Sequence, residues 1–371
     1  MVTDSGPLLF NGIKTKRREM MKLNSVMKRC LATVVIAFFS IAGTASAGGE
    51  VTKEYLDQFK PITESVVDNP SNLVTPAKVK LGKMLYFDVR LSKSGFLSCN
   101  TCHNLSMFGV SGLSTDIGHR WVLGPINGPT VLNAAFNVAQ FWNGRAKDLE
   151  EQAKGPILNP GEMGMPVETS VVKKISSIPG YRDFFTKAFP NDKEPVTYNN
   201  IAMAIAAFER TLLTPSRFDS FLKGDAKALT GREKRGLKLF VETGCTGCHN
   251  GIGIGGGSFQ KLGVVKPYKT ASEARGKFDI SKKEEDINVF KVPTLRNIEM
   301  TYPYFHDGRI WQLEEAVRTM ADIQLGTVLK DNEIADIVAF LKSLTGTIPA
   351  DALNIPVLPP SGKDTPTPDV N

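Results

Sequence analysis

The sequence predicts an all-α protein of two tandem helical domains with long loops, and three observations support this. One C-x-x-C-H motif lies in each half of the 371-residue chain, at residues 99–103 and 245–249. Residues that follow the first motif recur after the second at a constant offset of 164. Each half then ends in an apolar pattern of helical period. A chain of this length has room for two ordinary domains.

The N-terminal segment 1–47 is expected to be a secretory leader. Lys28 and Arg29 precede an apolar run at 31–41, and the Ala-Ser-Ala string at 45–47 offers a cleavage site. The run is too short to span a bilayer, so a permanent N-terminal anchor is the less favoured alternative. Cleavage of this signal peptide after export would leave the mature protein in the periplasm.

The net charge of +7 lies mostly in this leader, where seven basic residues accompany two acidic ones. The rest of the chain is nearly balanced in charge. No nucleic-acid partner is expected, because binding to a phosphate backbone needs a basic surface.

A helix is predicted immediately before each C-x-x-C-H motif. The first helix opens at Thr75-Pro76, where a capping residue precedes a proline at the first helical position. The second opens at Thr230, and Glu233 three residues later completes a capping box. Similar strings, GKMLY at 82–86 and GLKLF at 236–240, then lead toward the cysteines.

Each motif combines two thiols with an adjacent histidine. The four cysteines outside the leader could form disulfides, share a zinc ion or act as redox dithiols. None of these explains why two of the four histidines directly follow a C-x-x-C pair. Covalent haem attachment does, since the thiols add to the haem vinyl groups and the histidine ligates the iron. The sequence thus predicts two c-type haems, held by Cys99, Cys102, His103, Cys245, Cys248 and His249.

A glycine-rich run at 251–256 formally matches the G-x-G-x-x-G pattern of dinucleotide sites. Such a site needs a preceding strand and a helix that opens from the glycines. Here a haem-binding histidine lies just upstream, so the run is predicted to be a mobile loop instead.

Each half closes with an amphipathic helix and so follows the helical plan of a class I cytochrome c. Apolar residues recur at i, i+3, i+4 and i+7 as Ile201, Ala204, Ile205 and Phe208, and as Ile334, Ile337, Val338 and Leu341. We predict an N-terminal haem domain at 65–212 and a C-terminal haem domain at 213–350, with residues 48–64 packed on the latter. The proline-rich end, 351–371, is predicted to be a flexible tail.

The second axial ligand of each iron decides its chemistry. Histidine–methionine ligation favours electron transfer, whereas an iron with an open position can react with peroxide. His119 is one donor, although a loop histidine is more often structural. Met320 is another, although its helical spacing also fits core packing. The residues alone leave these alternatives open.

From residue 70 to residue 346 the chain resembles the bacterial dihaem cytochrome c peroxidases, in the superfamily of the methylamine-utilisation dihaem enzymes. Matching strings run in the same order along the chain. They are LYFDVRLS at 85–92, the two haem motifs, IGHRW at 117–121, GPTVLN at 128–133, FWNGR at 141–145, YPYFH at 302–306 and QLG at 324–326.

The resemblance implies different roles for the two haems. The N-terminal haem, on His103, would be the low-potential peroxidatic one, with His119 as a distal ligand that can leave. His249 and Met320 would hold a high-potential haem at which electrons arrive. A tyrosine replaces this methionine in the related enzyme that makes a tryptophan-derived cofactor, so Met320 favours the peroxidase.

The resemblance also implies a calcium ion between the domains. Its protein ligands would be the Asn127 side chain and the carbonyls of Thr301 and Pro303, completed by waters. Ligation by oxygen alone suits calcium.

Three further residues receive catalytic roles from the resemblance. Glu162 would be the distal acid/base and Gln152 a second polar group beside the peroxide, whereas the sequence alone suggests a solvated loop carboxylate for Glu162. Trp142 would bridge electrons between the haems, a role compatible with plain core packing. His306, its equivalent at the 164 offset, is expected to be structural.

The implied function is reduction of hydrogen peroxide to water. Electrons would come from a small periplasmic cytochrome c or cupredoxin, and the protein would be a homodimer. The alternative is a dihaem electron carrier without catalysis, which would need neither Glu162 nor Gln152. A haem-based sensor is disfavoured because the chain shows no output domain.

Overall fold

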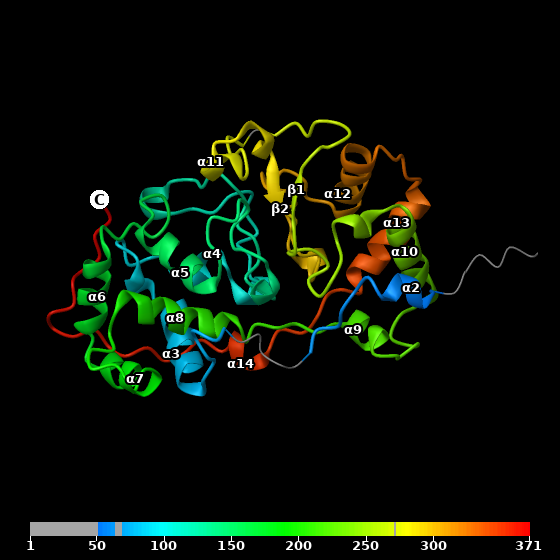
Figure 1. The fold of residues 1–371 in the computed structure, drawn as a ribbon. Helices are drawn as coiled ribbons and strands as arrows, with labels where there is room; N and C mark the ends of the chain where they lie inside the picture. The colour runs from blue at the N-terminus through cyan, green and yellow to red at the C-terminus, as the bar shows by residue number, and fades with distance from the viewer. Residues whose placement is uncertain (1–50, 64–68, 271) are drawn as a thin grey trace, which may run out of the picture. The chain divides into compact units, whose positions relative to one another are not determined.

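The fold of the computed structural model is described for residues 51–63, 69–270 and 272–371 (Figure 1). It is helix-rich, which confirms the predicted all-α class, and the leader predicted at 1–47 lies outside the described residues. One small antiparallel sheet pairs β1 (Phe259–Lys261) with β2 (Val289–Lys291), with Phe259 opposite Lys291. No helix in these ranges is long and apolar enough to cross a membrane.

The described helices follow one another in two similar series. The α-helices are α2 (Lys53–Leu56), α3 (Pro76–Phe87), α4 (Cys99–Cys102), α5 (Leu149–Leu158), α6 (Glu168–Ser176), α7 (Tyr181–Ala188), α8 (Tyr198–Glu209), α9 (Arg217–Leu222), α10 (Gly231–Glu242), α11 (Phe278–Ser281), α12 (Leu313–Met320), α13 (Asp331–Lys342) and α14 (Ala350–Leu353). Short 3-10 turns lie at Val89–Leu91, Leu105–Met107, His119–Trp121, Ala134–Phe136, Cys245–Gly247, Glu284–Asp286 and Ile298–Met300, and a π-helical turn at Ala321–Leu325.

In the N-terminal half, α3 packs across α8. The Thr75 side chain accepts from the Lys78 N–H and Pro76 occupies the first turn, so α3 begins where the sequence predicts. At the crossing, a Cβ on Gly82 would lie 1.8 Å from the Ala204 carbonyl oxygen. Only glycine lets the two backbones approach this closely.

The C-terminal half repeats this crossing with α10 and α13. The predicted capping box is confirmed, because Thr230 accepts from the Glu233 N–H and the Glu233 carboxylate accepts from the Thr230 N–H. A Cβ on Gly236 would lie 1.8 Å from the Asp336 carbonyl oxygen. The internal repeat therefore extends to the packing of the helices.

Two hydrophobic cores correspond to the two halves, and each takes in a segment from far away in the sequence. Phe59 packs in the core formed mainly by residues 218–344, and the Ile62 N–H donates to Asp219 Oδ1 at 2.6 Å. Ile348 and Ala352 pack in the other core, formed mainly by residues 81–212. The chain thus returns to its N-terminal half after α13.

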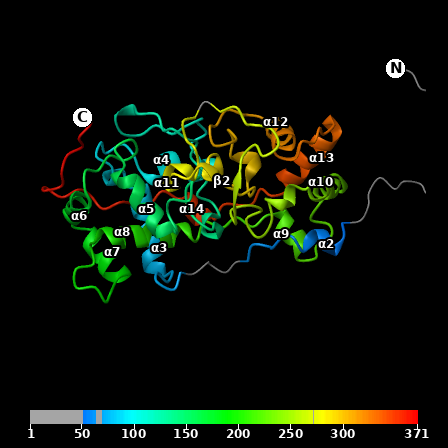
Figure 2. The same ribbon diagram turned by 45° about the horizontal axis from the view of Figure 1, so that its top comes forward.

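Two segments predicted to be mobile are held by specific contacts. After α14, the rest of the segment 351–371 runs alongside α3, α7 and α6 (Figures 1 and 2). Arg90 donates to the Pro359 carbonyl of this segment at 2.9 Å. In the glycine-rich loop, Ile254 is fully buried and Thr294 donates to the Gly253 carbonyl at 2.6 Å. Composition does not reveal these long-range hydrogen bonds, which position both segments in this conformation.

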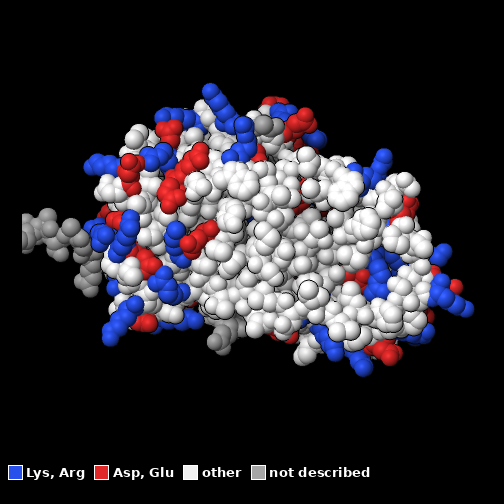
Figure 3. Space-filling model, turned by 180° about the vertical axis from the view of Figure 1, so that it is seen from behind, with Lys and Arg blue, Asp and Glu red and all other residues white. Residues whose placement is uncertain are grey.

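Charged side chains are unevenly distributed over the surface. Seen from behind, the middle of the face has few lysine, arginine, aspartate or glutamate side chains, and both ends carry a mixture of both signs (Figure 3).

Candidate functional site

The first haem motif forms one wall of a cavity of about 530 Å³ in the N-terminal half. Cys99, Cys102 and His103 all line it, because Ser98 and Thr101 form a capping box that starts α4 at the first cysteine. The Tyr86 hydroxyl donates to the His103 carbonyl at 2.6 Å and fixes the end of this turn. The His103 Nδ1 atom is buried and has no partner within the described residues.

Two predicted catalytic residues line the same cavity. Glu162 Oε1 accepts from Asn159 Nδ2 at 2.7 Å and lies 4.0 Å from the Arg145 guanidinium. Burial raises the pKa of Glu162, against the lowering effect of Arg145 and Asn159. The side chain keeps 40% exposure because it borders open space. Gln152, on α5, lines the cavity too, so a carboxyl and an amide share a cavity with His103.

His119 is not among the residues that line this cavity. Its N–H donates to the Glu162 carbonyl at 2.6 Å, and its ring is so close to Gly164 that a Cβ there would lie 2.8 Å from it. The ring is buried, and Nδ1 has no partner in the part of the chain described. The predicted distal ligand therefore stands outside the site in this conformation.

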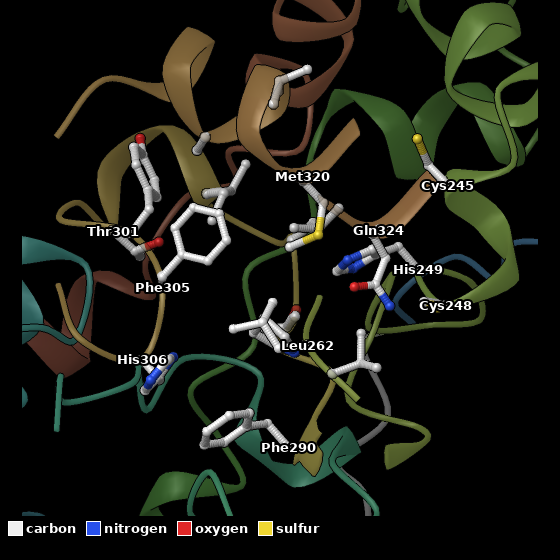
Figure 4. Close-up of a pocket in the computed structure, with 18 of the residues that line it drawn as sticks. Cys245, Cys248, His249, Leu262, Phe290, Thr301, Phe305, His306, Met320 and Gln324 are labelled. Carbon is white, nitrogen blue, oxygen red and sulfur yellow. The ribbon is translucent and has the colours of Figure 1, made fainter. Parts of the chain in front are cut away.

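The second motif lines a cavity of about 240 Å³ in the C-terminal half, together with Met320 (Figure 4). His249 Nδ1 lies 3.3 Å from the Ile254 carbonyl oxygen, a contact that orients the ring. Burial lowers the pKa of His249 to about 4, so the imidazole is neutral and able to ligate a metal.

Met320 ends α12, and a π-helical turn follows directly. Such turns change the direction of side chains at a helix end. Figure 4 shows the Met320 sulfur directed toward the His249 ring. An imidazole and a thioether on one cavity fit the ligand pair that electron-transfer haems use.

The two motifs also fit covalent haem by their chemistry. The four cysteines are free thiols, each on a cavity wall beside a histidine. Burial raises the pKa of Cys102 to about 12, with Asp116 and Glu162 adding to it. These half-buried, unpaired thiols suit attachment to an apolar macrocycle rather than disulfide exchange.

Trp142 and Phe290 separate the two cavities and line both. Their rings meet edge to face at 6.2 Å, and His306 stacks on Phe290 at 4.5 Å. The Trp142 Nε1–H donates to the Asn127 carbonyl at 2.8 Å. A continuous aromatic wall thus lies between the two haem motifs.

Paired backbone hydrogen bonds hold this wall. Asn127 N–H donates to the His306 carbonyl at 2.8 Å, and Lys291 N–H donates to the Trp142 carbonyl at 2.7 Å. Each residue of one pair lies 164 positions from its counterpart in the other, so the two halves meet with approximate twofold symmetry.

The residues expected to hold calcium lie together on the wall of the C-terminal cavity. These are Asn127, Thr301 and Pro303. The Asn127 amide nitrogen donates to the Leu113 and Ser114 carbonyls at 3.1 and 3.2 Å, which leaves its oxygen as the atom available to a cation.

Sequence reasoning missed two buried charged residues on these walls. Glu209, on α8, lines the N-terminal cavity, and burial raises its pKa to about 8. Lys291, on β2, lines the C-terminal cavity, and burial lowers its pKa to about 8. No acidic group in the described ranges pairs with the Lys291 ammonium, which suits a cofactor carboxylate. The one sequence signal for Glu209 was its position directly after Phe208, the last apolar residue in the pattern of the first closing helix.

Comparisons with known proteins match both halves of the chain. The family description "Di-haem cytochrome c peroxidase" matches residues 76–227, and "Cytochrome c" matches 233–345. The cytochrome c551 peroxidase of Nitrosomonas europaea is 51% identical over 92% of this chain and 98% of its own length. That of Pseudomonas aeruginosa is 48% identical over 84% and 90%.

More distant similarity extends to the methylamine-utilisation proteins. The protein MauG of Methylorubrum extorquens is 36% identical over 87% of this chain and 94% of its own. Among solved structures, a MauG-like protein associated with microbial copper homeostasis superposes with a TM-score of 0.71. It is 29% identical and covers 80% of this chain and 96% of its own.

Proposed function

Because this chain belongs to the di-haem cytochrome c peroxidase family, we propose that it reduces hydrogen peroxide at its N-terminal haem with electrons received at its C-terminal haem. Relatives 51% and 48% identical along most of their length establish the family. The protein is thus a cytochrome c peroxidase with two c-type haems.

The observation that carries the proposal is that Glu162, Gln152 and His103 line one cavity. A haem held by Cys99, Cys102 and His103 would supply the iron at which peroxide is bound and reduced. The Glu162 carboxyl moves a proton from the near oxygen of peroxide to the far one, so that the far oxygen leaves as water. Two electrons and two protons in all convert one peroxide into two waters. Gln152 orients the peroxide by hydrogen bonding, and Asn159 holds Glu162 in place.

Electrons arrive through the C-terminal haem in this proposal, held by His249 and Met320. Trp142 is proposed to carry them to the N-terminal haem, since it lines both cavities. A small cytochrome c or cupredoxin is the proposed donor. Asn127, Thr301 and Pro303 are proposed to bind calcium on the same wall, which would stabilise the contact between the halves.

His119 is proposed to be a reversible sixth ligand of the peroxidatic iron. The conformation described here would be the open one, because the ring packs on Gly164 instead of lining the cavity. A site open in the oxidised protein would react with peroxide without prior reduction.

The cellular setting is proposed from the sequence and the surface. A cleaved leader at 1–47 would deliver the enzyme to the periplasm, where it would remove peroxide. A homodimer is proposed as well, and the weakly charged face in Figure 3 supports it, since charged residues are depleted at the cores of interfaces.

The proposal is tested with purified holoprotein, reduced cytochrome c and hydrogen peroxide. Oxidation of two donor molecules for each peroxide consumed is expected. A dihaem carrier would exchange electrons with the donor yet leave peroxide unconsumed, and that result would reject the proposal.

A further inference from the structure

Residues 354–371, here called the C-terminal strap, extend along the N-terminal half after α14 (Figures 1 and 2). Five prolines restrict the strap: Pro356, Pro359, Pro360, Pro366 and Pro368. Proline fixes φ and lacks an N–H, so an extended proline-rich chain docks with little loss of conformational entropy. The strap is therefore suited to lie on a surface without secondary structure of its own.

The strap is docked at several points along its length. Arg90 Nη1 donates to the Pro359 carbonyl at 2.9 Å and to Ser361 Oγ at 3.1 Å. Farther on, Ser177 Oγ and Thr365 Oγ1 lie 3.1 Å apart. A Cβ on Gly95 would lie 2.9 Å from Pro368 Cγ, so the surface closely fits the strap there.

The C-terminal end of the strap, at Asp369 and Asn371, contacts Lys93. The Asp369 N–H donates to the Lys93 carbonyl at 3.0 Å. The Lys93 ammonium lies 3.2 Å from Asp369 Oδ2 and donates to the Asn371 backbone oxygen at 2.6 Å. Both the main chain and the side chain of Lys93 are thus held by Asp369 and Asn371.

Lys93 in turn holds the loop that carries Glu162. Its N–H donates to the Met163 carbonyl at 2.8 Å, and on the other side His119 N–H donates to the Glu162 carbonyl at 2.6 Å. Loop 159–164 is therefore held between Lys93 and His119. On the His119 side the loop backbone packs directly against Gly118, since a Cβ on Gly118 would lie 1.8 Å from the Gly161 carbonyl oxygen.

The strap is linked to His119 through Lys93 and loop 159–164. Within that loop, Gly164 packs against the His119 ring so closely that a Cβ on Gly164 would lie 2.8 Å from the ring. The strap, the Glu162 loop and the His119 ring thus form one contiguous set of contacts at the edge of the peroxidatic cavity.

We propose that the C-terminal strap is a conformational switch for the peroxidatic site, with Lys93 as its positioning residue. Docked, the strap fixes Lys93 and Met163, which holds Glu162 at the cavity and His119 outside it. Released, it frees loop 159–164 and lets His119 reach the cavity. The contacts at Lys93 are partly exposed and individually weak, so local release does not require unfolding. This inference rests on the roles proposed for Glu162 and His119.

The test compares fully oxidised holoenzymes by electron paramagnetic resonance and by the rate of azide binding. One variant ends at Pro359, and the other is Lys93→Gln, which keeps the backbone bonds to Met163 and Asp369 and loses the ammonium contacts to Asp369 and Asn371. We expect the high-spin N-terminal haem signal and the azide rate to fall about tenfold in the truncated enzyme and in the same direction, by less, in Lys93→Gln. Adding His119→Gly to either variant should restore both.

Lys342→Gln is the matched control, because Lys342 forms an exposed pair with Glu299 at 3.5 Å in the C-terminal half. It should change neither readout. Unchanged spin state and azide rate in Lys93→Gln and in the truncated enzyme would overturn the proposal, and if the truncated enzyme does not fold, Lys93→Gln alone decides. Both readouts are independent of peroxide chemistry, so they do not depend on whether Glu162 proves to be the acid/base.

Discussion

Asn133 and Asn297, one from each half of the protein, donate their side-chain amides to the single hydroxyl of Thr214, at 2.7 and 2.8 Å. The two asparagines are 164 positions apart, and all three residues are buried. The Thr214 N–H also donates to Asn133 Oδ1 at 2.9 Å. The sequence repeat thus has a structural counterpart in this hydrogen-bonded cluster, which lies where the chain passes from one half to the other.

Replacing Thr214 with valine should destabilise the protein strongly. The change leaves two buried amide groups without an acceptor, and each such group costs about 1–3 kcal/mol. We expect the free energy of unfolding of the holoprotein to fall by about 2 kcal/mol or more in denaturant titrations. Thr186→Val is the control, because Thr186 is exposed and bonds only within its own helix, and it should lie within about 0.5 kcal/mol of wild type. Equal effects of the two changes on the free energy of unfolding would show that the hydrogen bonds of Asn133 and Asn297 to Thr214 do not stabilise the protein.

The fold was largely predictable because its signals are local. Caps at Thr75 and Thr230 and apolar periodicity fix where helices begin and which face is buried. Adjacent cysteines and histidine bring the haem-attaching groups together within one turn, so Cys99, Cys102 and His103 needed no long-range information.

The remaining features depend on contacts between distant segments. The position of His119 follows from its packing on Gly164 and the hydrogen bond to Glu162, neither of which has a sequence signature. The path of the strap depends on contacts such as the one between Arg90 and Pro359. Proline content alone suggests disorder, although the same stiffness favours docking where a complementary surface exists.

Met320 should set the potential of the C-terminal haem. Replacing it with leucine removes the thioether, so the potential should fall and any methionine–iron absorption band should disappear. Spectroelectrochemical titration of the holoenzyme measures both. Met107→Leu is the control, since Met107 is 42% exposed and lines neither cavity. A band and potential that survive in Met320→Leu would show that another residue ligates this iron.

Glu209 should make the protein less stable as the pH rises. Burial raises its pKa to about 8, so the folded state keeps a proton that the unfolded chain releases above its ordinary pKa of about 4.3. Unfolding therefore releases a proton between these values, and stability is lost as the pH rises through that window, on the order of 1 kcal/mol per pH unit.

Glu209→Gln removes this titration and should flatten the dependence of unfolding free energy on pH between 5 and 8 relative to wild type. Denaturant titrations of the holoprotein at several pH values provide the measurement. The exposed Glu194→Gln should keep the wild-type slope. Parallel curves for wild type and Glu209→Gln would mean that Glu209 is ionised in the folded protein.

The turnover of Glu162→Gln with hydrogen peroxide and a reduced cytochrome c tests the central claim most directly. The amide keeps the size of the side chain and its contact with Asn159 but cannot relay a proton. Turnover should fall by a factor of about 100 or more, with two covalent haems and the high-potential couple unchanged. Glu168→Gln, an exposed change in the first turn of α6, should turn over like wild type. Near-normal turnover in Glu162→Gln would contradict the account and leave Glu162 as a loop carboxylate without a part in peroxide cleavage.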